Sequence, residues 1–200
     1  MERRSSAVNP LLDVYLYCGR WQLATADALY SDGDRYRPLR AAFRHIRGGL
    51  AAVQDMLLLG TGLGSAVHIL HRMGFHPRAT LVELDEVVLA LAAERMPAGT
   101  EGRLTPVCAD AAAYMQQQRA TYDLVVVDLF IGREVPAFVT GAPFLEQCFR
   151  SLRSGGYFVF NYIPESASAY TAVQALLRQR FPGYGLLEFG INKVFVWRKP

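Results

Sequence analysis

Three closely spaced glycines are the first candidates for ligand binding in this chain. Gly60, Gly62 and Gly64 separate an apolar run from a segment with helical periodicity. Glycines let the backbone turn tightly and approach a ligand, and the N-terminus of the following helix offers free N–H groups. In adenosine-binding sites an acidic residue about 20 residues further on accepts hydrogen bonds from the ribose hydroxyls. Glu83 lies at that distance, so these four residues are predicted to hold an adenosine ligand.

Two aspartates follow at comparable places further along the chain. Asp110 lies between an apolar run and a helical segment, which indicates either a helix cap or an acceptor for the adenine amino group. Asp128 ends the most hydrophobic run, and a carboxylate there is costly unless it is hydrogen-bonded or used. We therefore predict that Asp128 is catalytic. Asp85, close to Glu83, is predicted to cap a helix rather than to contact the ligand.

The elements that must position these residues alternate regularly after residue 50. Five apolar runs alternate with five helical segments, with strands predicted at 56–59, 79–83, 104–108, 123–128 and 157–161. Such alternation predicts an α/β, Rossmann-like fold, in which ligands bind beyond the carboxyl ends of the parallel strands. Two last strands, 185–189 and 193–197, are too close for a helical crossover and must be antiparallel. The expected sheet is mostly parallel and seven-stranded, with a C-terminal antiparallel hairpin typical of class I methyltransferase-like folds.

The first 48 residues have a different pattern. Residues 11–17 and 21–25 alternate around a glycine turn and predict a short N-terminal β-hairpin, and Pro38 is suited to open a helix over 39–46. We therefore divide the chain into residues 1–48, a hairpin with a connecting helix, and residues 49–200, a Rossmann-like nucleotide-binding domain. The apolar hairpin residues are candidate contacts of a homodimer: Val14, Leu16, Trp21 and Leu23.

Composition narrows the classes of partner. The chain has 200 residues, of which 52% are hydrophobic and 20% charged, as in ordinary globular proteins. No apolar stretch has the ~20 residues of a membrane-spanning helix, so no membrane partner is expected. The one dense basic group follows helical spacing and indicates a solvated helix face, so we expect no nucleic-acid partner. Three cysteines, far apart, fit neither a disulfide framework nor a zinc site and suit a cytoplasmic protein.

The order and spacing of these residues resemble the spermidine synthase family, from about residue 11 to the end. Leu81-Val-Glu-Leu-Asp85 is similar to the family's strand ending in Glu-x-Asp. Ala109-Asp110 occupies the place of its Gly-Asp pair, and Tyr122-Asp-Leu-Val-Val-Val-Asp128 fits its catalytic strand. Asp27 to Tyr36 is similar to the segment that joins the family's N-terminal domain to its nucleotide-binding domain. This resemblance implies that Tyr30 and Tyr36 face the substrate pocket.

The sequence departs from the family after Asp128. Spermidine synthases typically continue Asp-Ser-Ser-Asp-Pro, whereas this chain reads Asp128-Leu-Phe-Ile-Gly132 and lacks the second aspartate, which helps to bind and deprotonate the attacking amine. Glu134 is a candidate replacement that would bind substrate, and Arg133 would instead suit an anion. The N-terminal part is also shorter than the family's β-domain.

The resemblance implies a transferase whose co-substrate is S-adenosylmethionine or its decarboxylated form, with no metal. An aminopropyl or a methyl group would move to a small amine, and Asp128 would orient or deprotonate that amine. Two alternatives remain open. A non-catalytic relative that binds a nucleotide would explain the missing aspartate. A nicotinamide (NAD)-dependent oxidoreductase would explain the glycine turn, although the antiparallel hairpin argues against it.

Overall fold

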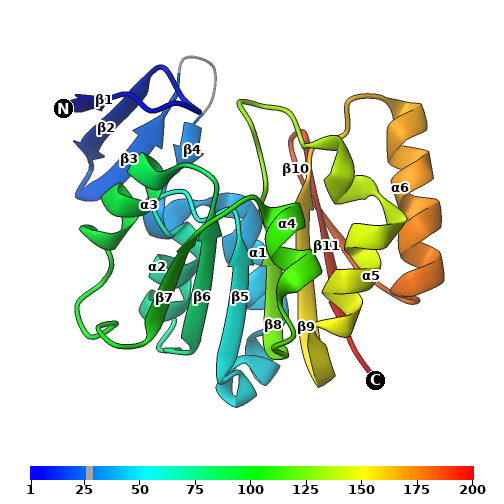
Figure 1. The fold of residues 1–200 in the computed structure, drawn as a ribbon. Coiled ribbons are helices and arrows are strands. Elements are labelled where there is room, and N and C mark those ends of the chain that lie inside the picture. The colour runs from blue at the N-terminus through cyan, green and yellow to red at the C-terminus, as the bar shows by residue number, and fades with distance from the viewer. Residues whose placement is uncertain (26–28) are drawn as a thin grey trace.

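A seven-stranded sheet forms the centre of the computed structural model, which describes residues 1–25 and 29–200 (Figure 1). Its strands are β5 (Asp55–Leu59), β6 (Arg78–Glu83), β7 (Leu104–Cys108), β8 (Tyr122–Val127), β9 (Leu152–Tyr162), β10 (Gly185–Phe189) and β11 (Asn192–Arg198). They lie in the order β10-β11-β9-β8-β5-β6-β7. Strands β5 to β9 are parallel, and β11 runs antiparallel to both β9 and β10. The predicted fold class is confirmed.

The position of each strand follows from its sequence. Strand β8 lies between β5 and β9, and its residues 124–127 are fully buried, as expected for a continuous β-branched run with both faces covered. Strand β7 contains Pro106 and lies at the edge of the sheet, where a missing backbone donor costs least. Because β5 pairs with β6 on one side and β8 on the other, the strand order reverses between β5 and β8.

Helices cover both faces of the large sheet (Figure 1). One face packs against α1 (Arg37–His45) and α2 (Ser65–Arg72), and the other against α4 (Ala111–Gln117), α5 (Ala142–Arg150) and α6 (Ala167–Arg180). Alternate residues of β8 serve the two layers, as the period of a strand requires. The remaining elements are α3 (Glu86–Ala93) and the 3₁₀ turns η1 (Gly33–Arg35), η2 (Arg47–Ala52) and η3 (Ala137–Thr140).

Helix α1 packs with the large sheet rather than with the N-terminal strands. Its buried residues Leu39, Ala42 and Phe43 belong to the same apolar cluster as Leu58 of β5 and Val126 of β8. The division of the chain between residues 48 and 49 stays a prediction. The packing of α1 groups this helix with the large sheet.

The N-terminal region is a four-stranded antiparallel sheet, larger than the single hairpin predicted. The hairpin itself is present as β2 (Leu12–Tyr17) and β3 (Arg20–Ala24), joined by a turn in which Cys18 and Gly19 have φ of 49° and 74°. Strands β1 (Glu2–Arg4) and β4 (Leu29–Ser31) extend it on either side. Both have only three residues, too few to show an alternating pattern. The family-like segment at 27–36 begins at Asp27, outside the described residues.

The small sheet lies at the carboxyl edge of the parallel strands (Figure 1). Its fully buried Leu12, Val14 and Leu23 pack with Leu63, which follows β5, and with Val88 and Leu91 of α3. No helix in residues 1–25 and 29–200 is long and apolar enough to cross a membrane.

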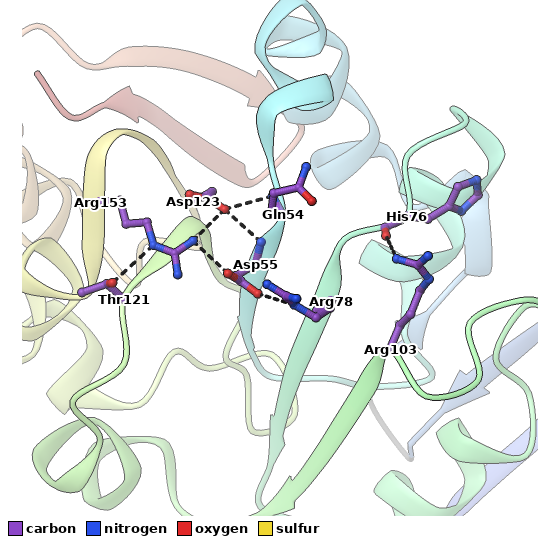
Figure 2. Close-up of polar contacts among 8 residues, drawn as sticks. All are labelled: Gln54, Asp55, His76, Arg78, Arg103, Thr121, Asp123 and Arg153. Atoms are coloured by element: carbon purple, nitrogen blue, oxygen red, sulfur yellow. Dashed lines mark hydrogen bonds and ion pairs between the residues drawn. The ribbon is translucent and has the colours of Figure 1, made fainter.

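An ion-pair network joins the opposite, amino-terminal edge of the large sheet (Figure 2). Arg153 Nη1 lies 2.8 Å from Asp55 Oδ2 and 2.9 Å from Asp123 Oδ2, and Arg78 Nε lies 2.8 Å from Asp55 Oδ1. Asp123 Oδ2 also accepts hydrogen bonds from the backbone N–H groups of residues 54 and 55. Hydrogen bonding to Arg78 lowers the pKa of Asp55, despite the opposing effect of burial. Asp123, part of the family-like motif that ends at Asp128, therefore ties strands together.

Replacing Arg153 with alanine is expected to lower the free energy of unfolding by about 1 kcal/mol, because it leaves two neighbouring carboxylates without their shared cation. Urea denaturation at low and high salt measures this, and the loss should shrink as salt screens the carboxylates. Arg103→Ala is the matched control. Arg103 lies at the same edge but donates one hydrogen bond to the carbonyl of His76, so its loss should stay within about 0.5 kcal/mol. Equal losses from the two variants would show that the network contributes nothing.

Candidate functional site

The carboxyl ends of β5, β6, β7 and β8 meet at one edge of the sheet, where a pocket of about 390 Å³ opens. A pocket beyond the strand ends, at the point where strand order reverses, is the usual ligand site of such sheets. The structure brings seven of the predicted site residues together in its lining: Tyr30, Tyr36, Gly60, Gly62, Glu83, Asp110 and Asp128.

Gly60 lies at the contact between the turn after β5 and the end of β8. It has φ of 86°, and a Cβ built there would lie 2.8 Å from the carbonyl carbon of Asp128 and closer still to its oxygen. The backbone N–H of Asp128 donates to the carbonyl of Leu59 at 2.9 Å. Only glycine allows the two chain segments to lie this close, which places the turn directly beside the backbone of Asp128.

Glu83, at the end of β6, holds the glycine turn by its backbone. Its Oε2 accepts hydrogen bonds from the N–H groups of Thr61 (3.0 Å) and Gly62 (3.1 Å), and its Oε1 accepts from that of Asp85 (3.2 Å). Burial raises the pKa of Glu83, although these hydrogen bonds oppose the shift. The carboxylate is half-buried, shapes the turn and also faces the pocket.

Asp110 and Asp85 both cap helices. Asp110 Oδ1 accepts from the N–H of Ala113 at 2.9 Å while the residue lines the pocket, so capping and pocket lining coexist. Asp85 accepts from the N–H groups of Val87 and Val88 at the start of α3, which confirms its prediction as a cap. Its second oxygen accepts from the side chain of Asn9 at 2.7 Å. This hydrogen bond fastens the N-terminal segment over the pocket.

Asp128 belongs to a hydrogen-bonded triad at the carboxyl edge of β8. Its Oδ1 accepts from Asn161 Nδ2 at 2.7 Å and from the Tyr36 hydroxyl at 3.3 Å, and Asn161 Nδ2 lies 2.8 Å from that hydroxyl. Asn161 Oδ1 in turn accepts from Asn192 Nδ2 at 3.1 Å. Among the described residues these hydrogen bonds fall on Oδ1, so Oδ2 is left for a ligand.

Burial controls the protonation of this triad. It raises the pKa of Asp128 to about 6, although the hydrogen bonds from Asn161 and Tyr36 oppose the shift. Burial, and then the neighbouring Asp128 carboxylate, raise the pKa of Tyr36 well above its usual range. Near neutral pH, Tyr36 is therefore a hydroxyl donor and Asp128 is a carboxylate that readily takes a proton, as a general base requires.

Tyr30 connects the N-terminal sheet to the loop after β8. Its hydroxyl donates to Asn9 Oδ1 at 3.3 Å and accepts from the N–H of Gly132 at 2.6 Å. These contacts fix one wall of the pocket, built from two segments about 100 residues apart in sequence.

Two predicted site residues lie outside the pocket lining. Glu134 is exposed and pairs with Ile131 in a short bridge that closes a turn, and it does not line the pocket. Gly64 is the residue just before α2 and has φ of 77°. A Cβ there would meet the side chain of Met96, so Gly64 faces Met96 rather than the cavity. Neither faces the cavity.

Asn161, Asn192 and Asn9 are the site residues that sequence reasoning missed. Asn161 ends an apolar stretch of β9 and is fully buried. A polar residue that ends a buried strand was the signal that identified Asp128, and the same reasoning would have found Asn161. Asn192 and Asn9 carry no such signal, because Asn192 begins β11 directly after the hairpin turn and Asn9 lies in an irregular segment.

The sheet order, the C-terminal antiparallel hairpin and the pocket at the reversal of strand order define a class I methyltransferase-like fold. Residues 44–176 match the model of the spermine/spermidine synthase domain, and the chain belongs to that family. No group of three or more His, Cys, Asp or Glu side chains in the described ranges is arranged to hold a metal ion.

Similar proteins carry related names. A polyamine aminopropyltransferase of Neisseria meningitidis is 29% identical over 113 residues, which cover 56% of this chain and 43% of that protein. The match therefore spans less than half of the relative's length. A probable spermidine synthase from Corynebacterium glutamicum superposes with a TM-score of 0.78 at 18% identity, covering 99% of this chain and 78% of that one. Human methyltransferase-like protein 13, in complex with SAH, gives a TM-score of 0.66 at 21% identity and covers 84% and 82% of the two chains.

Proposed function

We propose that this protein transfers an aminopropyl or methyl group from decarboxylated S-adenosylmethionine or S-adenosylmethionine to a small amine. The observation that carries the proposal is the Asp128 carboxylate, with its raised pKa, facing the same pocket as the glycine turn, Glu83 and Asp110. The names of the relatives, a polyamine aminopropyltransferase and a probable spermidine synthase, favour the aminopropyl form.

Each side chain then has a defined task. Glu83 accepts hydrogen bonds from the ribose hydroxyls, Asp110 accepts one from the adenine amino group, and Gly60, Gly62 and Gly64 hold the turn beside the ligand. Tyr30 and Tyr36 line the acceptor's approach. These assignments fit the donor because the carboxylates beside the glycine turn, half-buried at Glu83 and exposed at Asp110, can accept hydrogen bonds from its hydroxyl and amino groups.

The chemistry required of the protein is mainly alignment. The amine nitrogen attacks the carbon bonded to the sulfonium, the C–S bond breaks with its electron pair left on sulfur, and a neutral thioether leaves. Asp128 takes the proton that the nitrogen gives up, and its Oδ1 is held in place by Asn161 and Tyr36. Holding both reactants in line replaces a bimolecular encounter, which supplies about 7–11 kcal/mol in well-oriented systems.

The pKa of about 6 for Asp128 predicts how the reaction depends on pH. Below this value the carboxyl group is protonated and cannot accept a proton, so kcat/KM should rise with pH and bend near pH 6. Initial rates between pH 5 and 8, with each amine held at constant concentration, measure this. The bend should be missing in Asp128→Asn, and a bend that survives this substitution would assign the titration to another group.

Calorimetric titration with methylthioadenosine, S-adenosylhomocysteine and NAD tests the proposal. Preference for methylthioadenosine indicates aminopropyl transfer, and preference for S-adenosylhomocysteine indicates methyl transfer. Binding of NAD alone would overturn the proposal in favour of an oxidoreductase. Binding of a thioether without turnover of any amine would identify a non-catalytic relative.

Glu83→Gln should weaken binding of the preferred thioether about ten-fold, because an amide cannot accept from both the ribose and the turn as a carboxylate does. Glu86→Gln is the matched control. Glu86 is exposed in the first turn of α3 and lies outside the pocket lining. Equal effects of the two substitutions on the dissociation constant would remove Glu83 from the site.

We also propose a homodimer that forms through the N-terminal sheet. Of the four apolar hairpin residues considered from sequence, Val14 and Leu23 are fully buried, whereas Leu16 is 58% and Trp21 39% exposed. Leu16 and Trp21 are cross-strand partners, so they form one apolar surface. A monomeric mass in solution at micromolar concentration would refute this. Three free cysteines favour a reducing, cytoplasmic location, which we propose as well.

A further inference from the structure

Helix α1 has two faces of opposite character. Its inner face packs with the large sheet through Leu39, Ala42 and Phe43, which are buried. Its outer face carries the dense basic group of the sequence, here called the arginine stripe: Arg37, Arg40 and Arg44 of α1, and Arg47 just after the helix. All of these are exposed except Arg40, which is half-buried. A solvated face is the simpler interpretation of the sequence pattern, but the charge around this helix points further.

The arginine stripe holds more positive charge than the whole chain has in excess. The chain has 21 Lys and Arg residues against 18 Asp and Glu residues, which gives a net charge of +3. Without the four arginines of the stripe, 17 basic residues remain against 18 acidic ones, so the rest of the chain is slightly acidic. A basic group gathered on one face of an otherwise balanced protein is typical of a surface that binds a polyanion.

The carboxylates of the adjoining elements are paired with other cations. Asp34 of η1, just before α1, lies 2.5 Å from Nη1 of Arg72. Glu188 of β10, which packs beside α1, forms an ion pair with Lys193. Among the ion pairs within residues 1–25 and 29–200, none includes an arginine of the stripe. The positive charge of the stripe therefore stays available to an anion from solution.

The stripe works against the stability of its own helix. Like charges three or four residues apart on a helix repel each other, as Arg37, Arg40 and Arg44 do. Arg37 is the first residue of α1, and no acidic residue lies in the first turn, so this cation faces the positive end of the helix dipole. Arg44 lies near the carboxyl end and suits the dipole, but Arg37 and Arg40 do not. Departures of this kind from local stability rules are expected where a surface has a function.

The chemistry of the stripe favours phosphate groups. Its members are all arginines, and a guanidinium group can bind a phosphate through two parallel hydrogen bonds. From Arg37 to Arg47 the stripe extends about 15 Å, which matches about four phosphates along one strand of a duplex. A membrane surface fits less well, because no large apolar side chain of α1 is among the exposed ones in the described chain. Since its inner face packs with the sheet, α1 cannot enter a groove and reach base edges.

We propose that the arginine stripe binds the phosphate backbone of a nucleic acid without reading its sequence. Each guanidinium neutralises one phosphate, and the counterions of those phosphates are released into solution. The inference replaces the sequence-based expectation that nucleic acid is no partner. It is independent of the transfer function proposed above, and its test needs neither a nucleoside nor an amine.

Fluorescence anisotropy with the full chain tests the inference, with a labelled single-stranded RNA and a labelled DNA duplex, each about 20 nucleotides long. We expect a dissociation constant in the micromolar range at about 50 mM salt. Raising the salt to about 200 mM should weaken binding about 10²-fold, because about four phosphate contacts release their counterions. No binding of either nucleic acid at the lower salt, or binding that does not depend on salt, would overturn the inference.

A double substitution, Arg37→Gln with Arg44→Gln, should reduce the slope of log K against log salt by about two and weaken binding at low salt at least about ten-fold. The matched control is Arg119→Gln with Arg178→Gln. Both control residues are exposed, and they belong to the α4 and α6 layer on the opposite face of the sheet. The control makes the same change in net charge and should bind within about two-fold of the parent chain. Equal losses would show that net charge, and not the stripe, controls binding.

Two further measurements complete the test. Thermal denaturation should show the Arg37→Gln, Arg44→Gln protein to be at least as stable as the parent, since two repelling charges are removed. A loss of binding in this variant is then not a loss of folding. Polyglutamate and phosphatidylserine vesicles serve as competing polyanions. Tighter binding of either one than of both nucleic acids would assign the stripe to an acidic protein or a membrane surface and overturn the inference.

Discussion

Replacing Asp128 with asparagine is expected to lower the rate of group transfer about 10²–10⁴-fold, the usual contribution of a general base. The amide keeps an oxygen for the hydrogen bonds from Asn161 and Tyr36, so the geometry of the triad should survive. It cannot take a proton from the amine, however. Single-turnover rates with saturating donor measure the loss, and methylthioadenosine affinity should stay within about two-fold because Asp128 does not contact the nucleoside in the proposed arrangement.

The same substitution should make the protein more stable near neutral pH, by about 1–3 kcal/mol. In the folded state burial raises the pKa of Asp128 from 3.8 to about 6, so the ionised form is less favourable there than in the unfolded chain. Folding at intermediate pH therefore takes up a proton. The stabilisation that comes from protonating Asp128 in the folded protein is fully present below the unfolded pKa and is lost as pH rises through about 6. The gain from Asp128→Asn should consequently be largest above pH 7 and vanish near pH 4.

Asp123→Asn is the matched control, since it makes the same change in the same strand at the other edge of the sheet. Asp123 accepts from two backbone N–H groups and from Arg153, so losing its charge should cost about 1–2 kcal/mol of stability and leave transfer unchanged. Opposite signs of the two stability changes would separate a functional carboxylate from a structural one. If Asp128→Asn destabilises the protein and keeps its activity, Asp128 is structural too.

The large sheet could be predicted because each of its strands has a recognisable local sequence pattern. The β-branched run before Asp128 specifies a central strand, Pro106 specifies an edge, and the short link at residues 190–191 specifies an antiparallel hairpin. Strands β1 and β4 could not be predicted, because three residues are too few for a period. They are strands because they pair with the β2–β3 hairpin, so tertiary contacts rather than local sequence determine their structure.

Apart from Tyr30 and Tyr36, which the family resemblance indicated, the site was predictable only where a residue follows a strand along the chain. Glu83, Asp110 and Asp128 lie at strand ends, so topology alone brings them to one edge. Glu134 follows no strand directly, pairs with Ile131 and lies outside the pocket lining, which spacing could not reveal. Contacts such as Asn161 with Tyr36 join residues 125 apart, and no pattern within either segment specifies them.

Gly60→Ala is expected to be among the most damaging single-methyl additions in this chain. An alanine at φ of 86° costs about 1–2 kcal/mol in itself. Its methyl group would also overlap the Asp128 carbonyl, which is backbone at the end of a buried strand and cannot move without separating β5 from β8. Overpacking of this kind adds about 1–3 kcal/mol. Thermal and urea denaturation should show a total loss of about 3 kcal/mol, small enough for the fold to survive.

Gly74→Ala separates the clash from the backbone strain. Gly74 has the same φ of 86°, but a Cβ there would meet nothing within 4 Å. It should therefore lose only the 1–2 kcal/mol of strain and bind methylthioadenosine normally. Gly60→Ala should in addition bind it at least about ten-fold more weakly, because relief of the overlap moves the turn away from Asp128. Since φ is shared, any excess effect at Gly60 measures the close approach of the two strand ends. If Gly60→Ala and Gly74→Ala lose equal stability and equal affinity, the turn can shift to accommodate the methyl group. Its contact with Asp128 then does not set the shape of the pocket.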